Sequence, residues 1–441
     1  MVHSLLYTRP SHVSQDALSR LSSQDSCDES VKSNIGCSRG VPDALSFDRI
    51  VSGGTCPPVT VRDMLNYMKY IEHSEENLQF YLWFKSYETR FDQLSSSEKV
   101  LVPEWTRSQL DADAHAARKS KASNPIATFV KDAFDAETPP TVSVQRFDPF
   151  NTPPKPSSFT DEAKEVDSDS NTSLSTDARS DVKLNAKQAF DDAEMHWQPF
   201  STQPFRDEIT RIIGTYLAEG SPRELNISSR ERRAAMHALQ HTTHPSALKQ
   251  IASTVEYSLR KQAHPNFIRW TIGNANRPRV LFARGLGIAL ITLALIANII
   301  LTLSSAPRAW RVLPLVGWLL GISTLVAAIK GMCVVLHGLH HRNLRPWELF
   351  SDDDESCADE DFITPKCVLS GSRESSESAP WIAQYEKRNI IRKIFDRQTW
   401  IQEPALRQIQ DTIFLQSILG GLAIGGVAVG IFCALPSGNF F

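Results

Sequence analysis

The chain has 441 residues, with 47 basic and 50 acidic side chains and a formal net charge of −3. This length allows two or three domains, and the near-neutral charge argues against a nucleic-acid partner, which usually requires a strongly basic face. The seven cysteines form no CxxC pair and no regular spacing. We therefore expect neither a cysteine zinc site nor a disulfide framework.

Within the first 110 residues, the sequence pattern changes at residue 57. Residues 1–56 are rich in Ser, Asp and Gly without an apolar period, which predicts a disordered tail. From residue 57 the pattern is helical, and Thr60 is placed to begin a capping box at the start of a helix. A second helix is expected from Ser74 to about Phe91, and a weaker one around residues 97–110. The second helix contains a wall of aromatic side chains, Phe80, Tyr81, Trp83 and Phe84.

Residues 111–195 have a different composition, rich in Pro, Ser and Asp and poor in apolar side chains. Such a stretch cannot bury enough apolar surface to offset its chain entropy. We predict a mostly disordered insertion, with a short helix at residues 124–134.

Helical patterns resume over residues 196–275. Ser228 and Glu231 have the spacing of a second capping box, and helices are expected at about residues 229–241 and 246–262, and from Pro265 onward. No strand signal occurs in the part of the chain outside the long apolar runs. Because loop-closure entropy grows slowly with length, residues 57–110 and 196–275 can pack as the two halves of one all-α bundle.

Three long runs contain no charged residue: residues 285–303, 313–329 and 413–435. A bilayer core of about 30 Å requires roughly 17–25 such residues in a helix. We therefore predict three transmembrane helices, a loop between the second and third, and a short tail. The expected bounds are 280–303, 312–337 and 412–435 for the helices, 340–411 for the loop and 436–441 for the tail.

Basic residues near these runs predict the orientation. The short loop between the first two runs has only Arg308 and Arg311, whereas the opposite ends have many basic side chains. The positive-inside rule then places the N-terminal domain and the 340–411 loop in the cytosol and the tail outside or in a lumen. We expect an integral protein of the plasma membrane or an endomembrane, with Lys330 near the membrane interface.

Small residues mark one side of the third run. Gly421 and Gly425, and likewise Gly426 and Gly430, have the GxxxG spacing that lets helix backbones approach closely. We favour packing against the other two helices of the same chain. The alternative is a homo-oligomer formed through the Gly421–Gly430 face.

Two asparagines stand at starts of helices. Asn77 follows Glu75 and Glu76 ahead of the aromatic wall, and Asn226 stands ahead of the second capping box. Each position alone has a local explanation, since Asn satisfies free backbone N–H groups and acids favour a helix N-terminus. Their occurrence together, at similar junctions in one all-α domain, argues against a purely local explanation.

The SEEN motif at residues 74–77 and the LNIS motif at residues 225–228 resemble those of the regulator-of-G-protein-signalling (RGS) domain. That domain is a nine-helix bundle that binds the GTP-bound α subunit (Gα) of heterotrimeric G proteins. The stretches at residues 203–247, 260–280 and 400–416 resemble a fungal branch with three C-terminal membrane spans. The layout is similar to that of the RGS-like membrane protein of yeast bud-site selection.

The resemblance implies a fold and a set of partner-binding residues. The expected fold is an RGS-like helical bundle, split by a disordered insertion and followed by three transmembrane helices. Glu76 and Asn77 match the first Gα-contact loop of the family and Asn226 matches the second. In the third loop Gln262 and Asn266 stand where the family usually has an acid and a basic residue, so charge-assisted contacts are lost there.

Two functions follow from this resemblance. The first is a membrane-anchored regulator that binds the switch loops of Gα-GTP and accelerates GTP hydrolysis by Gα. The alternative is a non-catalytic RGS-like scaffold or landmark for cell polarity or morphogenesis. In neither case is the chain an enzyme itself, because it has no nucleophile–base pair and no cofactor fingerprint.

Two groups of histidines have spacings seen in metal sites. They are His237, His241 and His244, and His337, His340 and His341. No acid or cysteine nearby in the sequence completes either group, so no metal and no cofactor are expected.

Overall fold

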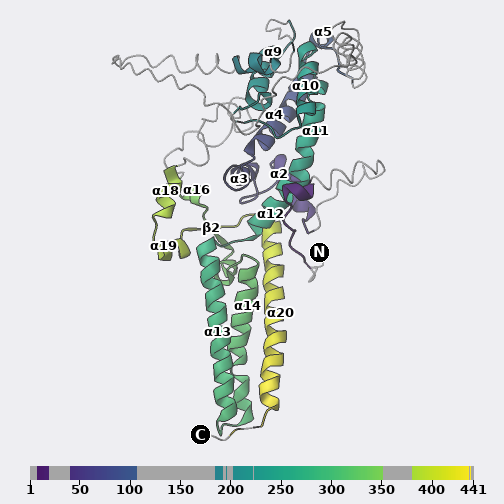
Figure 1. Ribbon diagram of the computed structural model, residues 1–441. Coiled ribbons are helices and arrows are strands. Elements are labelled where there is room, and N and C mark those ends of the chain that lie inside the picture. The colour runs from purple at the N-terminus through teal and green to yellow at the C-terminus, as the bar shows by residue number, and fades with distance from the viewer. Residues whose placement is uncertain are drawn as a thin grey trace, which may run out of the picture. The chain divides into compact units, whose positions relative to one another are not determined.

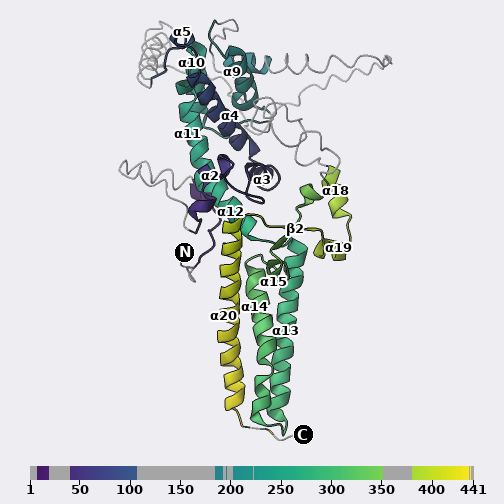
Figure 2. The ribbon, with the colours of Figure 1, turned by 180° about the vertical axis from the view of Figure 1, so that it is seen from behind.

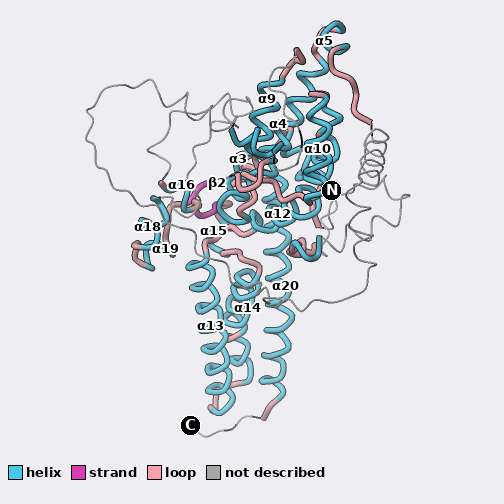
Figure 3. Tube along the Cα trace, turned by 45° about the horizontal axis from the view of Figure 1, so that its top comes forward, coloured by secondary structure: helices cyan, strands magenta, loops and turns pink. Residues whose placement is uncertain are grey.

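The computed structural model describes residues 7–18, 40–106, 184–191, 195, 202–221, 223–350, 380–436 and 438. Helices dominate this part of the chain, and the strands are short (Figure 3). The predicted all-α class is therefore confirmed. The helix predicted at residues 124–134 and most of the predicted insertion lie outside the described residues.

The chain divides into two compact units. The first comprises Met1–Arg90 and Ala252–Phe441, and the second comprises Phe91–Ile251. This division does not follow the predicted bundle halves, because residues 252–275 belong with residues 57–90.

The first unit has a group of bundle helices and a group that includes the long apolar helices. The bundle helices are η2 (Asp43–Leu45), α2 (Phe47–Val51), α3 (Val61–Tyr67), the π-helical turn η3 (Met68–Glu72), α4 (Glu75–Asp92), α11 (Lys249–Ser258), the π-helical turn η6 (Leu259–Ala263) and α12 (His264–Ile272). The second group is α13 (Arg277–Leu303), η7 (Arg308–Val312), α14 (Leu315–Ile329), α15 (Val334–Gly338), α16 (Pro346–Leu349), α18 (Pro380–Glu386), α19 (Ile390–Ile394) and α20 (Pro404–Ala434).

Among its described residues, the second unit contains helices and loops but no strand. Its elements are α5 (Ser96–Val100), α9 (Arg206–Ile212), the π-helical turn η4 (Ile213–Leu217), α10 (Ser229–His241) and η5 (Pro245–Ala247). Residues 184–191 form a further helix, in which Ala186 and Phe190 are fully buried.

Both predicted capping boxes are present. At the start of α3, the Asp63 backbone N–H donates to Thr60 Oγ1 over 3.2 Å, and the Thr60 N–H donates to Asp63 Oδ2 over 3.0 Å. At the start of α10, Ser228 and Glu231 make the same pair of bonds, over 3.2 and 3.1 Å. Two free N–H groups at each helix start are thus satisfied, and α10 has the predicted bounds.

The aromatic wall of α4 is buried. Phe80, Tyr81, Trp83 and Phe84 each expose 4% of their surface or less. The Trp83 ring lies 5.7 Å from Phe80 and stacks at 5.1 Å on Tyr87, measured between ring centroids. Aromatic side chains of this size dominate the burial energy of a core, so this wall anchors α4 as predicted.

The prediction of disorder over residues 1–56 is wrong for residues 40–56. Leu45 and Ile50 are fully buried, and the Phe47 ring packs 5.6 Å from the ring of Tyr81. His264 Nε2 bonds the Leu45 carbonyl over 2.8 Å. The three apolar residues Leu45, Phe47 and Ile50 are too few to show a helical period in the sequence. This segment is ordered because it contacts residues distant in sequence.

Helices α13, α14 and α20 run side by side (Figures 1 and 2). They include the three segments that are long and apolar enough to cross a membrane: Arg277–Leu303, Arg308–Ile329 and Pro404–Ala434. The number and approximate positions of the predicted spans are thus confirmed by length and composition.

Glycines allow these helices to approach closely. A Cβ at Gly287 of α13 would lie 3.0 Å from the Gly321 carbonyl oxygen of α14. A Cβ at Gly421 of α20 would lie 3.1 Å from the Leu319 carbonyl oxygen, also in α14. Gly421 therefore packs within the chain, as the favoured interpretation predicts, whereas Gly426 has open space around its Cβ position.

The second apolar helix is shorter than the predicted 312–337. Helix α14 ends at Ile329, Gly331 follows with φ of +79°, and α15 begins only at Val334. A positive φ costs glycine little, so Gly331 is suited to this break. Lys330 follows α14 directly, and its Nζ donates to Gln416 Oε1 of α20 over 2.8 Å. Its position near a membrane interface stays a prediction.

Two short strands occur where the sequence has no strand signal. β1 (His341–Asn343) pairs antiparallel with β2 (Gln398–Trp400) within the predicted 340–411 loop. A three-residue strand is too short for the alternation of apolar and polar residues that marks strands in sequence.

A junction joins the last bundle helix to the apolar helices. Gln410 Nε2 of α20 donates to the Ile272 carbonyl over 3.0 Å, and Arg345 Nη2 donates to the Gly273 carbonyl over 3.3 Å. The Asn274 carbonyl accepts from the Asn343 N–H over 2.9 Å. The free carbonyls at the end of α12 are thus satisfied by residues far away in sequence.

Arg311 joins all three apolar segments at the opposite end. Its side chain is fully buried, and Nη1 donates to the carbonyls of Phe432 and Leu435 over 3.0 and 2.7 Å. Nη2 donates to the Thr302 carbonyl over 3.5 Å. The planar guanidinium is suited to this task because its donors point in several fixed directions.

We expect Arg311→Lys to destabilise the packing of the apolar helices. A single ammonium cannot reach all three carbonyls, and each lost charge-assisted bond costs about 1–3 kcal/mol. The test is to unfold the full chain in mixed micelles by raising the concentration of a denaturing detergent, and to measure the unfolding midpoint. Arg308→Lys is the matched control, since Arg308 is exposed in the same element. Equal unfolding midpoints for the two variants would contradict this assignment.

Candidate functional site

A sharp change of direction places Glu76 and Asn77. The π-helical turn η3 ends at Glu72, and the next residue, His73, has φ of +52°. This left-handed conformation is uncommon outside glycine but tolerated by Asn, Asp and His. Helix α4 then begins at Glu75, so Glu76 and Asn77 lie in its first turn, where backbone N–H groups lack helical partners.

The Asn77 amide is weakly held. Its Nδ2 lies 3.5 Å from the Ser74 carbonyl oxygen and 3.4 Å from Glu76 Oε1, both at the long limit for a hydrogen bond. Both contacts use the amide nitrogen as donor, so neither satisfies a free N–H of α4. Helix capping therefore does not explain Asn77, and its amide can exchange these contacts for those of a partner.

Glu76 is half-buried at the same helix start. Burial raises the pKa of the Glu76 carboxyl to about 7, and the neighbouring charge of Glu75 adds to the shift. The carboxyl is thus poised between its neutral and charged forms near neutral pH. A partner that offers hydrogen-bond donors would favour the carboxylate.

Asn226 lies in the second unit and is exposed. The preceding residue, Leu225, is fully buried, and its N–H donates to the Tyr216 carbonyl over 3.0 Å. The Ile227 N–H donates to the Leu225 carbonyl over 2.9 Å, which closes a tight turn centred on Asn226. With Leu225 buried and Ser228 capping α10, Asn226 projects from a fixed backbone.

The predicted third contact follows a distortion of the α11–α12 helix. Gln262 is half-buried in the π-helical turn η6, three residues before Pro265, which is the second residue of α12. Proline has no N–H, and its ring would clash with the carbonyl four residues earlier in a regular helix. The wider turn relieves this clash.

Asn266 is used inside the chain. It exposes 2% of its surface, and its Oδ1 accepts from the Val13 N–H over 2.9 Å. Its Nδ2 donates to the Val13 carbonyl over 2.9 Å and to Glu72 Oε1 over 3.0 Å. As a partner contact, Asn266 would require the Val13 segment to move away.

These two neighbours of Asn266 could not be predicted from the sequence. Val13 lies in a stretch predicted to be disordered, and Glu72 lies in the first bundle half. Burial raises the pKa of the Glu72 carboxyl, while hydrogen bonds from Asn266 and Tyr67 oppose this shift. Tyr67 donates its hydroxyl to Glu72 Oε1 over 3.0 Å.

Arg260 is likewise committed to internal contacts. Its Nη1 lies 2.8 Å from Asp48 Oδ2 and its Nε lies 2.8 Å from Glu256 Oε1. The guanidinium also lies over the Phe47 ring, 4.8 Å from the centroid. This basic residue therefore holds α2 to the α11–α12 helix.

The predicted contact residues are divided between the units. Glu76, Asn77, Gln262 and Asn266 belong to the first unit, and Asn226 belongs to the second. Within the first unit, Glu72 accepts a hydrogen bond from Asn266. It lies three residues before Glu75, where α4 begins.

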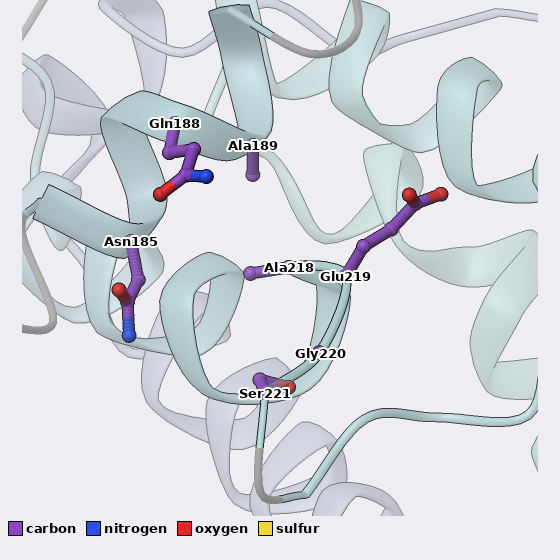
Figure 4. A pocket seen from close by; sticks show the side chains of 7 residues that line it. All are labelled: Asn185, Gln188, Ala189, Ala218, Glu219, Gly220 and Ser221. Atoms are coloured by element: carbon purple, nitrogen blue, oxygen red, sulfur yellow. The ribbon is translucent and has the colours of Figure 1, made fainter. Parts of the chain in front are cut away.

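A small hollow in the second unit has a polar lining (Figure 4). Asn185 and Gln188 from the 184–191 helix face the turn of Ala218–Ser221. Its one acid, Glu219, pairs with Arg232 Nη1 over 2.7 Å. None of the predicted contact residues lines this hollow.

His237 and His241 in the second unit pack around an aromatic ring. Trp105 stacks on His241 with centroids 5.7 Å apart and meets the edge of His237 at 5.6 Å. Within the described residues, these two histidines belong to no metal-binding cluster.

Two asparagine variants separate internal from exposed roles. We expect Asn266→Ala to lower the free energy of unfolding by about 2–3 kcal/mol, because Val13 and Glu72 lose buried partners. Asn226→Ala is the matched comparison and should change it by about 0.5 kcal/mol or less, since the side chain is exposed. Thermal unfolding of the full chain in nanodiscs measures both. A large loss for Asn226→Ala or none for Asn266→Ala would contradict these assignments.

Glu76→Gln should stabilise the chain in a pH-dependent manner. The folded pKa of about 7 exceeds the ordinary value of 4.5, so wild-type stability falls as pH rises from about 4.5 to 7. The variant lacks this titration, and its advantage should grow by about 1–2 kcal/mol between pH 5 and pH 8, allowing for partial exposure. Unfolding midpoints at the two pH values test this, and a difference independent of pH would contradict it.

The family model of the regulator of G protein signaling domain matches residues 170–272. No curated protein and no solved structure matches the chain significantly. The matched range includes Asn226, Gln262 and Asn266, ends with α12, and does not extend to Glu76 and Asn77. The family match, together with the helical fold, supports an RGS-domain protein whose matched domain directly precedes the first of three helices apolar enough to cross a membrane.

Proposed function

We propose that the chain is a membrane-anchored regulator of heterotrimeric G-protein signalling that binds Gα-GTP and accelerates its hydrolysis. The observation that carries this proposal is the RGS match over residues 170–272. That range includes Asn226, which is exposed on a fixed turn, as a contact residue requires.

The proposed mechanism is differential binding. Gα supplies its own arginine and its own water-orienting glutamine, and hydrolysis is limited by how well the switch loops hold them. A surface that binds those loops best in their transition-state arrangement lowers the barrier, and each 1.4 kcal/mol of such preference gives about tenfold in rate. The amides of Asn77 and Asn226 would bond the switch loops, and the Glu76 carboxylate would accept from their N–H groups.

The apolar helices supply the proposed anchor. Basic residues near the bundle ends of these helices support a cytosolic position for that end under the positive-inside rule. They are Arg277, Arg279, Arg284, His340, His341, Arg342, Arg345, Lys387, Arg388, Arg392, Lys393, Arg397 and Arg407. Gα proteins act at the cytosolic membrane surface, so anchoring would raise the effective concentration and offset a weak affinity.

The test is single-turnover GTP hydrolysis by purified Gα subunits with an excess of the full chain in nanodiscs. We expect at least about tenfold acceleration, lost in the double variant Asn77→Ala/Asn226→Ala. Asn185→Ala is the matched control, since it removes an exposed amide that the proposal does not use. No acceleration by the folded chain, or acceleration that survives the double variant, would contradict the proposal.

A second candidate is a non-catalytic RGS-like membrane scaffold for cell polarity or morphogenesis. It is favoured by the third contact, where Gln262 carries no charge and the Asn266 amide is already bonded to Val13 and Glu72. Binding to Gα without faster hydrolysis, or no binding at all, would favour this candidate.

A further inference from the structure

Two histidines and an aspartate from separate elements meet beside the apolar helices. His337 lies in α15, His340 lies two residues beyond its end, and Asp411 lies in α20. One ligand atom from each of the three lies within 4.8 Å of the other two. The cluster belongs wholly to the first unit and shares no residue with the predicted Gα contacts.

The distance between two of these atoms suits a shared ion better than a direct bond. His337 Nε2 lies 3.4 Å from Asp411 Oδ1. A charge-assisted hydrogen bond is usually about 2.7–2.9 Å long. Two ligands of a tetrahedral zinc ion, each about 2.0–2.1 Å from the metal, lie roughly 3.3 Å apart.

The imidazoles also have unused nitrogens. His337 exposes 4% of its surface, and its Nδ1 has no hydrogen-bond partner among the described residues. The Nδ1 of His340 is buried and unpartnered in the same way. A buried polar atom without a partner costs about 1–3 kcal/mol, and coordination through Nδ1 would recover that cost at His340. His337 faces Asp411 through its other nitrogen, Nε2.

The backbone at His340 is held in a strained conformation that keeps the rings together. His340 has φ of +53°, and its N–H donates to the His337 carbonyl over 2.8 Å. The two rings are nearly perpendicular, at 85°, with centroids 5.8 Å apart. Strain of this kind persists where the surrounding structure fixes it, and it clusters at functional sites.

We propose that His337, His340 and Asp411 form a binding site for a divalent transition-metal ion of the zinc type. Two imidazoles and one carboxylate are typical zinc donors, and three protein ligands leave a fourth position open to water. No acid lies near these histidines in the sequence, but Asp411 of α20 completes the set of ligands in the folded chain.

The bound ion would strengthen the attachment of α20. Asp411 directly follows Gln410, whose side chain bonds the end of α12 at the Ile272 carbonyl. The site therefore ties the turn after α15 to the same part of α20 that holds the last bundle helix.

The experiment uses the full chain in nanodiscs, with a purification tag that contains no histidine and after removal of metal by a chelator. Cobalt(II) is titrated while its visible absorption is recorded, because tetrahedral cobalt absorbs far more strongly than the aqueous ion. Zinc is then added in competition. We expect one equivalent of cobalt to give the tetrahedral spectrum and zinc to displace it.

Asp411→Asn and His340→Asn should each weaken the affinity by more than about tenfold. Asparagine tolerates the left-handed backbone of residue 340, so that exchange preserves the fold. His73→Asn is the matched control, because it makes the same exchange at another left-handed histidine, with φ of +52°. Circular dichroism without metal checks that all variants are folded.

The outcomes are distinct. Loss of the cobalt spectrum in the two cluster variants, with His73→Asn like wild type, supports the site. Absence of the spectrum in the folded wild-type chain, or a spectrum unchanged by both cluster variants, would overturn it.

Discussion

The end of α12 is the constraint on which much of the first unit depends. The last carbonyls of a helix have no partners within it, and burying them unsatisfied would cost several kcal/mol. Here the Ile272, Gly273 and Asn274 carbonyls accept from Gln410, Arg345 and Asn343. One helix terminus thus fixes where α20 and the segment after α15 must lie, and basic Arg345 is favoured by the negative end of the helix dipole.

Aromatic stacking reinforces the same junction. Trp347 stacks on both Trp270 and Tyr70, with centroids 5.9 and 5.0 Å apart, and the Arg345 guanidinium lies 3.7 Å from the Trp270 centroid. The segment after α15 is thereby packed against α12 and η3. Because η3 leads into the start of α4, the predicted contact residues Glu76 and Asn77 are connected to the apolar helices through packed side chains.

The N-terminal segment completes this arrangement. Arg9 donates from Nε to the Arg269 carbonyl over 3.1 Å and from Nη1 to the Lys330 carbonyl over 2.7 Å. Val13 then occupies the Asn266 amide. The same segment therefore holds α12 to the end of α14 and covers the predicted contact residue Asn266. A partner could reach Asn266 only if this segment left its place.

The features that are correctly predicted from the sequence depend on residues that are close together in the chain. The capping boxes at Thr60 and Ser228 need a spacing of three residues, and the apolar helices need only an uninterrupted run. The features that were missed depend on residues that are distant in sequence. Asp411 beside His337, Val13 on Asn266, and the burial of Leu45 and Phe47 become visible only when the chain is folded.

The candidate Gα surface was predictable only in part. The family match reaches Asn226, Gln262 and Asn266, whereas Glu76 and Asn77 rest on the SEEN motif and on the weakly held Asn77 amide. That Asn266 is internal could not be inferred from composition, because an amide before a phenylalanine serves equally well as a core hydrogen-bonding group or as a partner contact.

The central claim is that the chain recognises the transition-state arrangement of Gα. The most direct measurement is the affinity of the full chain in nanodiscs for Gα bound to GDP and aluminium fluoride, to a non-hydrolysable GTP analogue, and to GDP. The account predicts tightest binding to the aluminium fluoride form, which mimics the transition state, and weakest binding to the GDP form. Equal affinity for all three forms, or no binding to any, would contradict it.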